Sequence, residues 1–487
     1  MATYVPVIGL EIHAELDTKT KMFCDCKNDP DEEHPNINVC PICLAHPGAM
    51  PTANKKAIES VIKVGMALQG DIPAVSKFDR KNYFYPDLPK AYQISQYDQP
   101  LVFGGVLKGV RLRRVHLEED TGALTHENSK LQALNSKSDS SLVNFNRAGV
   151  PLMELVTEPD IRNADDAVAF AKELQLILRY LSVSYADMDR GQMRVEANVS
   201  LGKIHDGELV FGTKVEVKNI NSFRAVHDAI EYELQRQRMV LEEGGEVKHE
   251  TRGWNESSRE TVSQRTKEEA HDYRYFPEPD LPPLDLSRFP LNDIKLSIPE
   301  LPAQKRIRFA KEFDLSEPQA DLLVSDPRLA SHFEDSVSEL MSEDNQNLAQ
   351  EIKLLFNYLT SDLRGLMIEN GIKFEELKIT PENFADLVEL ISHNTVSSRS
   401  AKDILRSMMQ TGADPHTVLK EQDLHQISDE EALLDVVRRV IETNVSAVSD
   451  FKNGKENALQ FLVGKAMAEL KGKGNPEVLQ RMIRERT

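Results

Sequence analysis

Alternation of apolar and polar side chains over residues 7–16 constrains the fold of this chain more than any other feature. In this stretch, VIGLEIHAEL, the polar positions between the later apolar ones are Glu11, His13 and Glu15. A period of two puts these three side chains together on one face of a β-strand and leaves the apolar side chains on the other. The apolar face has to pack against a core. The polar face is either a solvated strand surface or a metal or acid/base cluster, and these residues alone leave both interpretations open.

Length and charge bound the remaining possibilities. The 487 residues suffice for two to four domains, and the lack of a long apolar run or a secretory signal predicts a soluble, cytoplasmic protein without a membrane span. A net charge of −20 argues against nucleic-acid binding over the whole surface, because polyanions are held by positive potential. Residues 451–487 carry eight Lys and Arg against four Asp and Glu, so this basic end either holds phosphates or is an ordinary solvated surface.

All four cysteines fall in one short window, as Cys24-x-Cys26 and Cys40-x-x-Cys43. Two close pairs separated by a polar loop are typical of a tetrahedral Cys₄ zinc knuckle with a structural role. The alternatives are free thiols or two disulfides, and the lack of a secretory signal disfavours the disulfides. His34 and His46 are nearby substitutes if one cysteine is not a ligand. A closed zinc site would leave no cysteine as a catalytic nucleophile.

Two further stretches are candidates for a binding site. Residues 76–96, SKFDRKNYFYPDLPKAYQISQ, combine aromatic, basic and proline residues, and predict either a binding loop or a tyrosine-rich edge strand. A strand expected over 106–120 ends in HLEED, whose three carboxylates repel one another unless a cation or a basic group lies between them. Strict alternation would place Glu118 and Asp120 on the face of His116 and Glu119 on the other, but spacing alone does not decide which one turns inward.

The pattern of elements predicts an α+β fold. Strands with polar faces are expected again over 192–200 and 213–218, and helices are expected over 55–68, after an Asn163 cap, and from Ser222 to Gly244. We therefore expect an antiparallel sheet whose concave side is a charged site. From Pro302 onward the pattern is almost wholly helical. The predicted domains are 1–293, containing the sheet and the cysteines, a helical domain 294–408, and a helical tail 409–487.

Several long motifs together carry a family resemblance. VIGLEIHAEL, SKFDRKNYFYPDLPKAYQISQ, HLEEDTG, FNRAGVPLMELVTEPDIR, GTKVEVKNINSF, ETRGW and HDYRYFPEPDLPPL, in this order, resemble the B subunits of glutamine-dependent aspartyl/glutamyl-tRNA amidotransferases. The resemblance implies a cradle domain similar to glutamine synthetase that binds ATP and Mg²⁺. It implies phosphorylation of Glu or Asp misacylated on tRNA-Gln or tRNA-Asn, followed by amidation with ammonia from an amidase partner, the A subunit. It also implies a small third partner, the C subunit, and tRNA held by the helical region and the tail.

The resemblance also implies roles for individual residues. Glu11, His13 and Glu119 would be the metal ligands, which requires the strand end near 119 to depart from simple alternation. Because histidine is an unusual ligand for Mg²⁺, Mn²⁺ is an alternative. Lys81 and Tyr83 would lie at the nucleotide or at the transferred phosphate. The same cleft would be lined by Glu154, Arg194 and Glu196, the last at a position where the family often has Asp.

What the sequence lacks agrees with this interpretation. It contains no G-x-x-x-x-G-K-[ST] loop and no obvious Ser/Lys amidase signature, so ammonia from glutamine would have to come from a partner. Two alternatives remain: a free-standing ligase of glutamine synthetase type that acts on a small acid, and a zinc-stabilised, non-catalytic tRNA-binding scaffold. The sequence does not distinguish Glu-tRNA-Gln from Asp-tRNA-Asn as the substrate.

Overall fold

The computed structural model describes residues 4–126, 141–266, 273–341, 345–427, 429–470 and 472–487. The chain divides into two compact units, Met1–Pro302 and Ala303–Thr487. The domain boundary expected after residue 293 falls within the first unit. Residues 271–272 of the HDYRYF motif lie outside the described residues. None of the described helices combines the length and the apolar character needed to cross a membrane.

The first unit is built around a ten-stranded sheet in the order β15-β14-β13-β11-β1-β10-β7-β5, with β6 paired to β7 and β12 to β11. The strands are β1 (Tyr4–Glu15), β5 (Val102–Phe103), β6 (Val106–Leu107), β7 (Val110–Glu119), β10 (Pro151–Thr157), β11 (Met193–His205), β12 (Glu208–Val210), β13 (Val215–Ile220), β14 (Glu250–Asn255) and β15 (Glu260–Thr266). The stretch over 7–16 is thus the central part of the fold, because β1 lies between β10 and β11.

Strand pairing in this sheet is antiparallel with one exception. The strands β13 and β14 run parallel, with Glu216 opposite Thr251 and Lys218 opposite Gly253. The helix α3 (Phe223–Glu242) connects them, and a crossover helix of this kind brings the chain back in the same direction. The α+β class expected from the sequence is confirmed, with this parallel pair as an addition that the strand pattern does not reveal.

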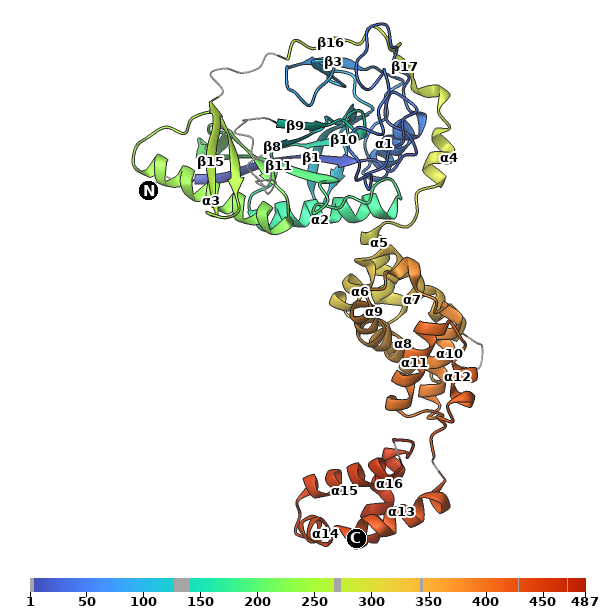
Figure 1. Cartoon of the computed structure of the whole chain (residues 1–487). Coiled ribbons are helices and arrows are strands. Elements are labelled where there is room, and N and C mark those ends of the chain that lie inside the picture. The colour runs from blue at the N-terminus through green and yellow to red at the C-terminus, as the bar shows by residue number, and fades with distance from the viewer. Residues whose placement is uncertain (1–3, 127–140, 267–272, 342–344, 428, 471) are drawn as a thin grey trace, which may run out of the picture. The chain divides into compact units, whose positions relative to one another are not determined.

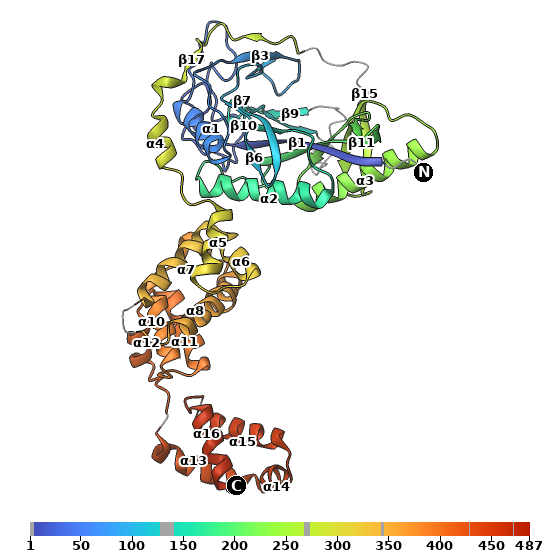
Figure 2. The same cartoon turned by 180° about the vertical axis from the view of Figure 1, so that it is seen from behind.

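The apolar face of the sheet packs against helices to form the main core. The helices of this unit are α1 (Lys55–Ala67), α2 (Ala164–Tyr180), α3 and the short α4 (Leu291–Leu296). In both views α2 and α3 run along the same side of the sheet (Figures 1 and 2). The predicted caps are confirmed, since the side chain of Asn163 accepts a hydrogen bond from Asp166 N and that of Ser222 accepts one from Ala225 N. Ile8, Leu10 and Ile12 of β1 are buried between these helices and the neighbouring strands.

Smaller sheets lie on the opposite side from α2 and α3 (Figures 1 and 2). They are the sheet of β16 (Phe276–Pro277), β3 (Asp79–Asn82) and β4 (Tyr92–Ser95), and the pair β17 (Leu284–Asp285) and β2 (Val75–Ser76). A further pair joins β8 (Ala123–His126) to β9 (Ser141–Asn144). The tyrosine-rich stretch over 76–96 therefore contains two paired strands joined by a loop, in which Phe84 and Tyr85 are exposed.

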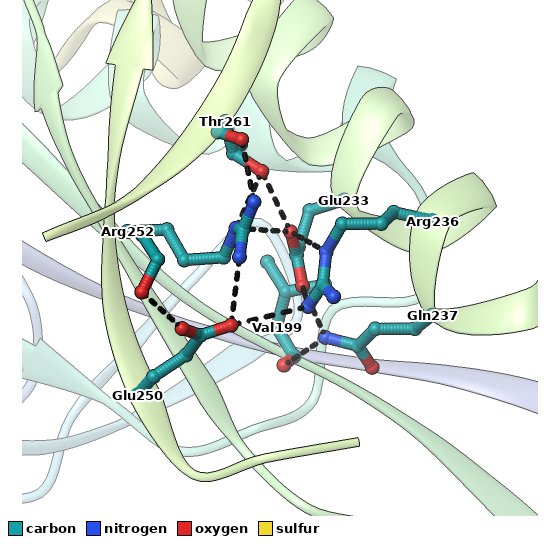
Figure 3. A network of polar contacts seen from close by, with 8 residues as sticks. Val199, Glu233, Arg236, Gln237, Glu250, Arg252 and Thr261 are labelled. Atoms are coloured by element: carbon teal, nitrogen blue, oxygen red, sulfur yellow. Dashed lines mark hydrogen bonds and ion pairs between the residues drawn. The ribbon is translucent and has the colours of Figure 1, made fainter. Parts of the chain in front are cut away.

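A buried polar network joins the β14–β15 hairpin to α3 (Figure 3). Glu233 of α3, which is 0% exposed, accepts hydrogen bonds from both Arg236 Nε and Arg236 Nη2 and from Gln237 Nε2. It also accepts one from Thr261 Oγ1 on β15, at 3.0 Å. Arg252 on β14 donates to Thr261 and to Glu250, and so extends the network to both strands of the hairpin. These charged groups fix the hairpin to the helix, in addition to the packing of Trp254 on β14 against Tyr232 on α3.

The second unit is helical throughout its described part. Its helices are α5 (Pro302–Glu312), α6 (Glu317–Val324), α7 (Pro327–Leu340), α8 (Leu348–Asn357), α9 (Arg364–Asn370), α10 (Pro381–Ser392), α11 (Ser398–Thr411), α12 (Pro415–Glu421), α13 (Glu430–Thr443), α14 (Val445–Lys452), α15 (Glu456–Glu469) and α16 (Pro476–Arg486). Thr380 caps α10 ahead of Pro381, because its side chain accepts a hydrogen bond from Asn383 N. Leu433, Leu462 and Ile483 belong to an apolar core of the last helices.

Candidate active site

The strand register places one row of polar side chains across the middle of the sheet. On β1, His13 is opposite Arg194 of β11 on one side and Glu154 of β10 on the other. Glu154 is in turn opposite His116 of β7. Because paired residues point to the same face, these side chains share the polar face, opposite the one that packs on the helices. The sequence shows the alternation in β1 and β11, but it shows neither the strand β10 nor the register.

A first cluster forms around His13. Its Nε2 lies 3.5 Å from Glu118 Oε1 and 3.4 Å from Glu154 Oε2, and His116 Nε2 lies 3.3 Å from Glu154 Oε2. Burial alone would lower the pKa of His13, but Glu154 and Glu118 outweigh it and raise that pKa to about 9. Burial would raise the pKa of Glu154, but His116 and His13 hold it well below its usual range. The ligand atoms of His13, Glu118 and Glu154 all lie within 4.8 Å of one another, so they could hold one metal ion.

A second cluster lies next to the first on the same face of the sheet, around Glu11 of β1. Glu11 is two residues from His13 and opposite Glu196 of β11, and Glu216 of β13 completes a group whose ligand oxygens lie within 4.8 Å of one another. Asn198 Nδ2 donates to Glu11 Oε1 at 2.8 Å, and Lys218 Nζ lies 2.9 Å from Glu196 Oε2. Burial, and then the charges of Glu154 and Glu196, raise the pKa of Glu11. The three carboxylates of this cluster thus outnumber the single ammonium group of Lys218, and a bound cation would compensate the remaining negative charge.

Lys81 lies beside the first cluster, and Tyr83 follows it two residues later in the chain. Lys81 Nζ lies 3.9 Å from Glu118 Oε2 and 5.3 Å from the centre of the Tyr273 ring. Although burial opposes it, the charges of Glu118 and Glu154 raise the pKa of Lys81 well above its ordinary value, so the ammonium stays charged. Tyr83 Oη donates to Gln93 Oε1 at 3.4 Å and its ring packs edge-on against Tyr273. Lys81 thus lies beside the first cluster and Tyr83 beside Tyr273, and their role at the nucleotide stays a prediction.

Glu119 lies elsewhere. Its carboxylate accepts hydrogen bonds from Lys90 Nζ at 2.6 Å and from the backbone N–H of Ile94 at 2.9 Å. It lines a cavity of about 270 Å³ together with Cys43 and other residues of the cysteine loop. The end of β7 follows simple alternation, with Glu118 beside His13 and Glu119 on the other face. The set Glu11, His13 and Glu119 is therefore not brought together as one cluster of ligand atoms.

Arg194 reaches the polar face but is paired within the protein. Its Nη2 donates to Asp120 Oδ2 at 2.9 Å, and Arg147 Nε lies 3.5 Å from the same oxygen. Although burial opposes it, these two arginines lower the pKa of Asp120. The pair ties β11 to the turn that follows β7. His13 of β1 thus lies between Arg194 and Glu154.

The four cysteines form a third cluster. The Sγ atoms of Cys24, Cys26, Cys40 and Cys43 all lie within 4.8 Å of one another, and no disulfide joins them. The Sγ atom of Cys43 is 4.0 Å from that of Cys26 and 3.9 Å from that of Cys40. Four thiolates at about 2.3 Å from a tetrahedral zinc ion would be separated by about 3.8 Å. The cluster is therefore compatible with a structural metal.

Three members of these clusters, Glu118, Glu216 and His116, are not assigned by the sequence alone. Glu118 is one of the alternatives that the sequence leaves open at the end of the strand, where alternation places it, together with Asp120, on the face of His116. Glu216 lay in a recognised strand, aligned with Lys218, but nothing in the sequence paired that strand with β11. In the sequence His116 is marked only by its place beside the carboxylates, and its contact with Glu154 comes from the pairing of β7 with β10.

Comparison with known proteins identifies the family of both units of the chain. The family model described as the GatB/GatE catalytic domain matches residues 6–291, and the model described as the GatB domain matches residues 339–486. Curated relatives named as B subunits of aspartyl/glutamyl-tRNA(Asn/Gln) amidotransferase include one from Caldicellulosiruptor saccharolyticus, 45% identical over 99% of this chain and 98% of its own. Another, from Caldanaerobacter subterraneus subsp. tengcongensis, is 45% identical over 99% of both chains. This chain belongs to the family of these B subunits.

Proposed function

We propose that this chain is the ATP-dependent component of a tRNA amidotransferase. It would phosphorylate the side-chain carboxylate of Glu or Asp misacylated on tRNA-Gln or tRNA-Asn and convert it to the amide. The observation that carries the proposal is the pair of adjacent acidic clusters around His13 and Glu11 on one sheet face. Family membership over the whole chain supports it, because the relatives carry the name of this activity.

Two sets of residues are suited to divalent cations. His13, Glu118 and Glu154 form the first set, and Glu11, Glu196 and Glu216 form the second. The second set offers only oxygen, which suits Mg²⁺, whereas the imidazole in the first also suits Mn²⁺. A cation bound there would neutralise charge on the phosphates of ATP during transfer. Glu119 is assigned a structural role instead, because Lys90 and Ile94 N already occupy its carboxylate.

The protein residues would position the reactants. In the first step a carboxylate oxygen of the aminoacyl side chain attacks the γ-phosphorus of ATP, and ADP leaves with the electrons of the broken P–O bond. Lys81, held over the first cluster by Glu118, would hold a phosphoryl oxygen through its ammonium. Tyr83 would contact the nucleotide beside it, and Arg194 would lie at the rim of the same cleft. In the second step ammonia attacks the acyl carbon of the mixed anhydride, phosphate leaves, and the nitrogen loses a proton.

The other components of the reaction would come from partners and from a second metal. The four cysteines would hold one structural Zn²⁺, away from the reacting atoms. The sequence carries no glutaminase signature, so we propose that an amidase partner, the A subunit, supplies ammonia and that a small C subunit completes the complex. The helical tail would contact tRNA through its basic residues.

The test is ATP cleavage by the chain co-expressed with its two partners, with Glu-tRNA-Gln and Asp-tRNA-Asn added separately. Glutamine or ammonium serves as the nitrogen donor. We expect misacylated tRNA to trigger phosphate release coupled to amide formation. Glu154→Gln should abolish both, because it removes a carboxylate from between two histidines. Glu158→Gln is the matched control and should keep both, because Glu158 directly follows β10 and pairs with the exposed Arg113.

Three outcomes would contradict the proposal. Full activity of Glu154→Gln would remove that carboxylate from the site. Phosphate release that requires a small carboxylic acid but does not depend on added tRNA would indicate a free-standing ligase. Binding of tRNA without phosphate release from either donor would favour a scaffold.

A further inference from the structure

Lys21 is fully buried, with 0% of its surface exposed. It lies between β1 and the first pair of cysteines. Lysine side chains are almost never fully buried unless an anion accompanies them, because an ammonium group loses its hydration on burial. The surroundings of this one side chain therefore ought to contain a negative charge.

Its three hydrogen-bond partners identify that charge. Lys21 Nζ donates to the carbonyl oxygens of Asn38 at 2.7 Å and Phe145 at 3.2 Å, and to Cys43 Sγ at 3.8 Å. An ammonium group has three N–H donors, so this set accounts for all of them. Among the described residues no carboxylate comes within ion-pair distance of Nζ. The sulfur of Cys43 is thus the one partner that can carry a negative charge.

We infer that Lys21 is the counter-ion of the Cys₄ metal centre and connects that centre to the loop before β10. The inference rests on the structural metal proposed above. Four thiolates around a divalent cation carry a net charge of −2, and a half-buried site with this charge needs a compensating cation. Lys21 supplies it through an N–H···S contact with Cys43, and is a positioning residue for the metal ligands.

The same side chain connects the cluster with the polar face. Phe145 O accepts from Lys21 Nζ, and Met22 N donates to Gly149 O at 2.7 Å, so both ends of residues 145–149 are held by neighbouring residues of one segment. Gly149, at φ +86°, comes so close that an added Cβ would lie 3.6 Å from both Cys43 Cβ and Lys21 Cδ. Gly149 N also donates to Asp120 O at 2.9 Å. This loop leads directly into β10, which carries Glu154, so the metal centre would fix the start of that strand.

The test compares metal retention in the full chain of three proteins. Wild type, Lys21→Met and Lys27→Met are purified with zinc, and zinc per chain is measured by elemental analysis. The rate of zinc transfer to a chromophoric chelator is then followed. Lys27 is the matched control because it is in the same cysteine loop but its side chain is 70% exposed and pairs with Asp29. We expect about one zinc in wild type, transfer at least tenfold faster from Lys21→Met, and an unchanged rate for Lys27→Met.

A second measurement needs no variant and covers the case in which Lys21→Met does not fold. Hydrogen exchange of wild type is compared before and after zinc removal. We expect the amides of Met22 and Gly149 to lose protection on removal, whereas that of Leu234 on α3 keeps it. Equal zinc transfer from wild type and Lys21→Met would overturn the counter-ion role, and unchanged protection of Met22 and Gly149 would overturn the connection. Wild type that contains no zinc would instead overturn the proposed centre itself, and activity of the polar face would remain a separate question.

Discussion

Replacement of Glu233 by Gln is expected to loosen the β14–β15 hairpin from α3. The change keeps the size of the side chain but removes a fully buried negative charge (Figure 3). The carboxylate accepts from Arg236 at 2.9 and 2.6 Å, from Gln237 at 2.8 Å and from Thr261 at 3.0 Å. A Gln amide offers one acceptor oxygen and turns an NH₂ group toward donors.

The magnitude follows from these contacts. At least two hydrogen bonds are lost, and those from Arg236 are charge-assisted, which makes each worth about 1.5–3 kcal/mol. The guanidinium of Arg252, 3.6 Å from the same carboxylate, also loses a counter-charge. Breaking a buried ion pair on one side costs about 3–5 kcal/mol, and we expect a loss in that range. With an m-value of about 3 kcal/mol/M, the urea midpoint should fall by about 1 M or more.

The assay is urea unfolding followed by tryptophan fluorescence. Trp254 is the only tryptophan of the chain and lies on β14, buried beside Tyr232. Its signal therefore reports the hairpin itself. Glu242→Gln, at the exposed end of the same helix, is the matched control and should shift the midpoint little. Equal midpoints for the two variants would refute the reasoning that the carboxylate of Glu233 holds the hairpin.

Three further predictions test other parts of the structure. Burial lowers the pKa of His332 from 6.5 to about 4, although Asp335 opposes this, so the folded helical unit takes up the proton later than the unfolded chain. The free energy of unfolding of this unit, measured by urea unfolding with circular dichroism, should therefore fall by about 2 kcal/mol between pH 7.5 and pH 5. In His332→Leu this dependence of the unfolding free energy on pH should become weaker. The same pH dependence in the variant as in wild type would contradict the prediction. Cys43→Ser should lower zinc per chain well below one by elemental analysis, and full zinc content would exclude Cys43 as a ligand. Lys81→Met should raise the KM for ATP about tenfold or more, because one charge-assisted contact to phosphate is lost, and an unchanged KM would place the nucleotide elsewhere.

Local patterns were sufficient to predict the elements that carry the site. The alternation in β1 identified its core face and its polar face, and Asn163 and Ser222 identified the starts of two helices. The cysteine spacing predicted a cluster that the structure brings together. These features depend on a few neighbouring residues, so a sequence records them directly.

Contacts between strands could not be predicted in the same way. The pairing of β1 with β11 and of β11 with β13 brings Glu11, Glu196 and Glu216 together, and the first of these pairings joins residues as far apart in sequence as Glu11 and Glu196. The burial of Lys21 could not be predicted from the sequence, because the same residues surround a lysine near cysteines whether its side chain faces solvent or a sulfur atom. At 118–120 the simple alternation described the geometry, whereas the choice of Glu119 required a departure that the strand does not make.

The central claim is that this chain phosphorylates a carboxylate attached to tRNA. The most direct measurement uses Glu-tRNA-Gln or Asp-tRNA-Asn with ¹⁸O in the side-chain carboxylate, the complete complex, ATP and ammonium, and determines the oxygen isotopes of the released phosphate. If an acyl phosphate forms, the phosphate carries away one carboxylate oxygen, so we expect ¹⁸O in the phosphate for every amide formed. Amide formation with phosphate that contains no ¹⁸O would contradict the account.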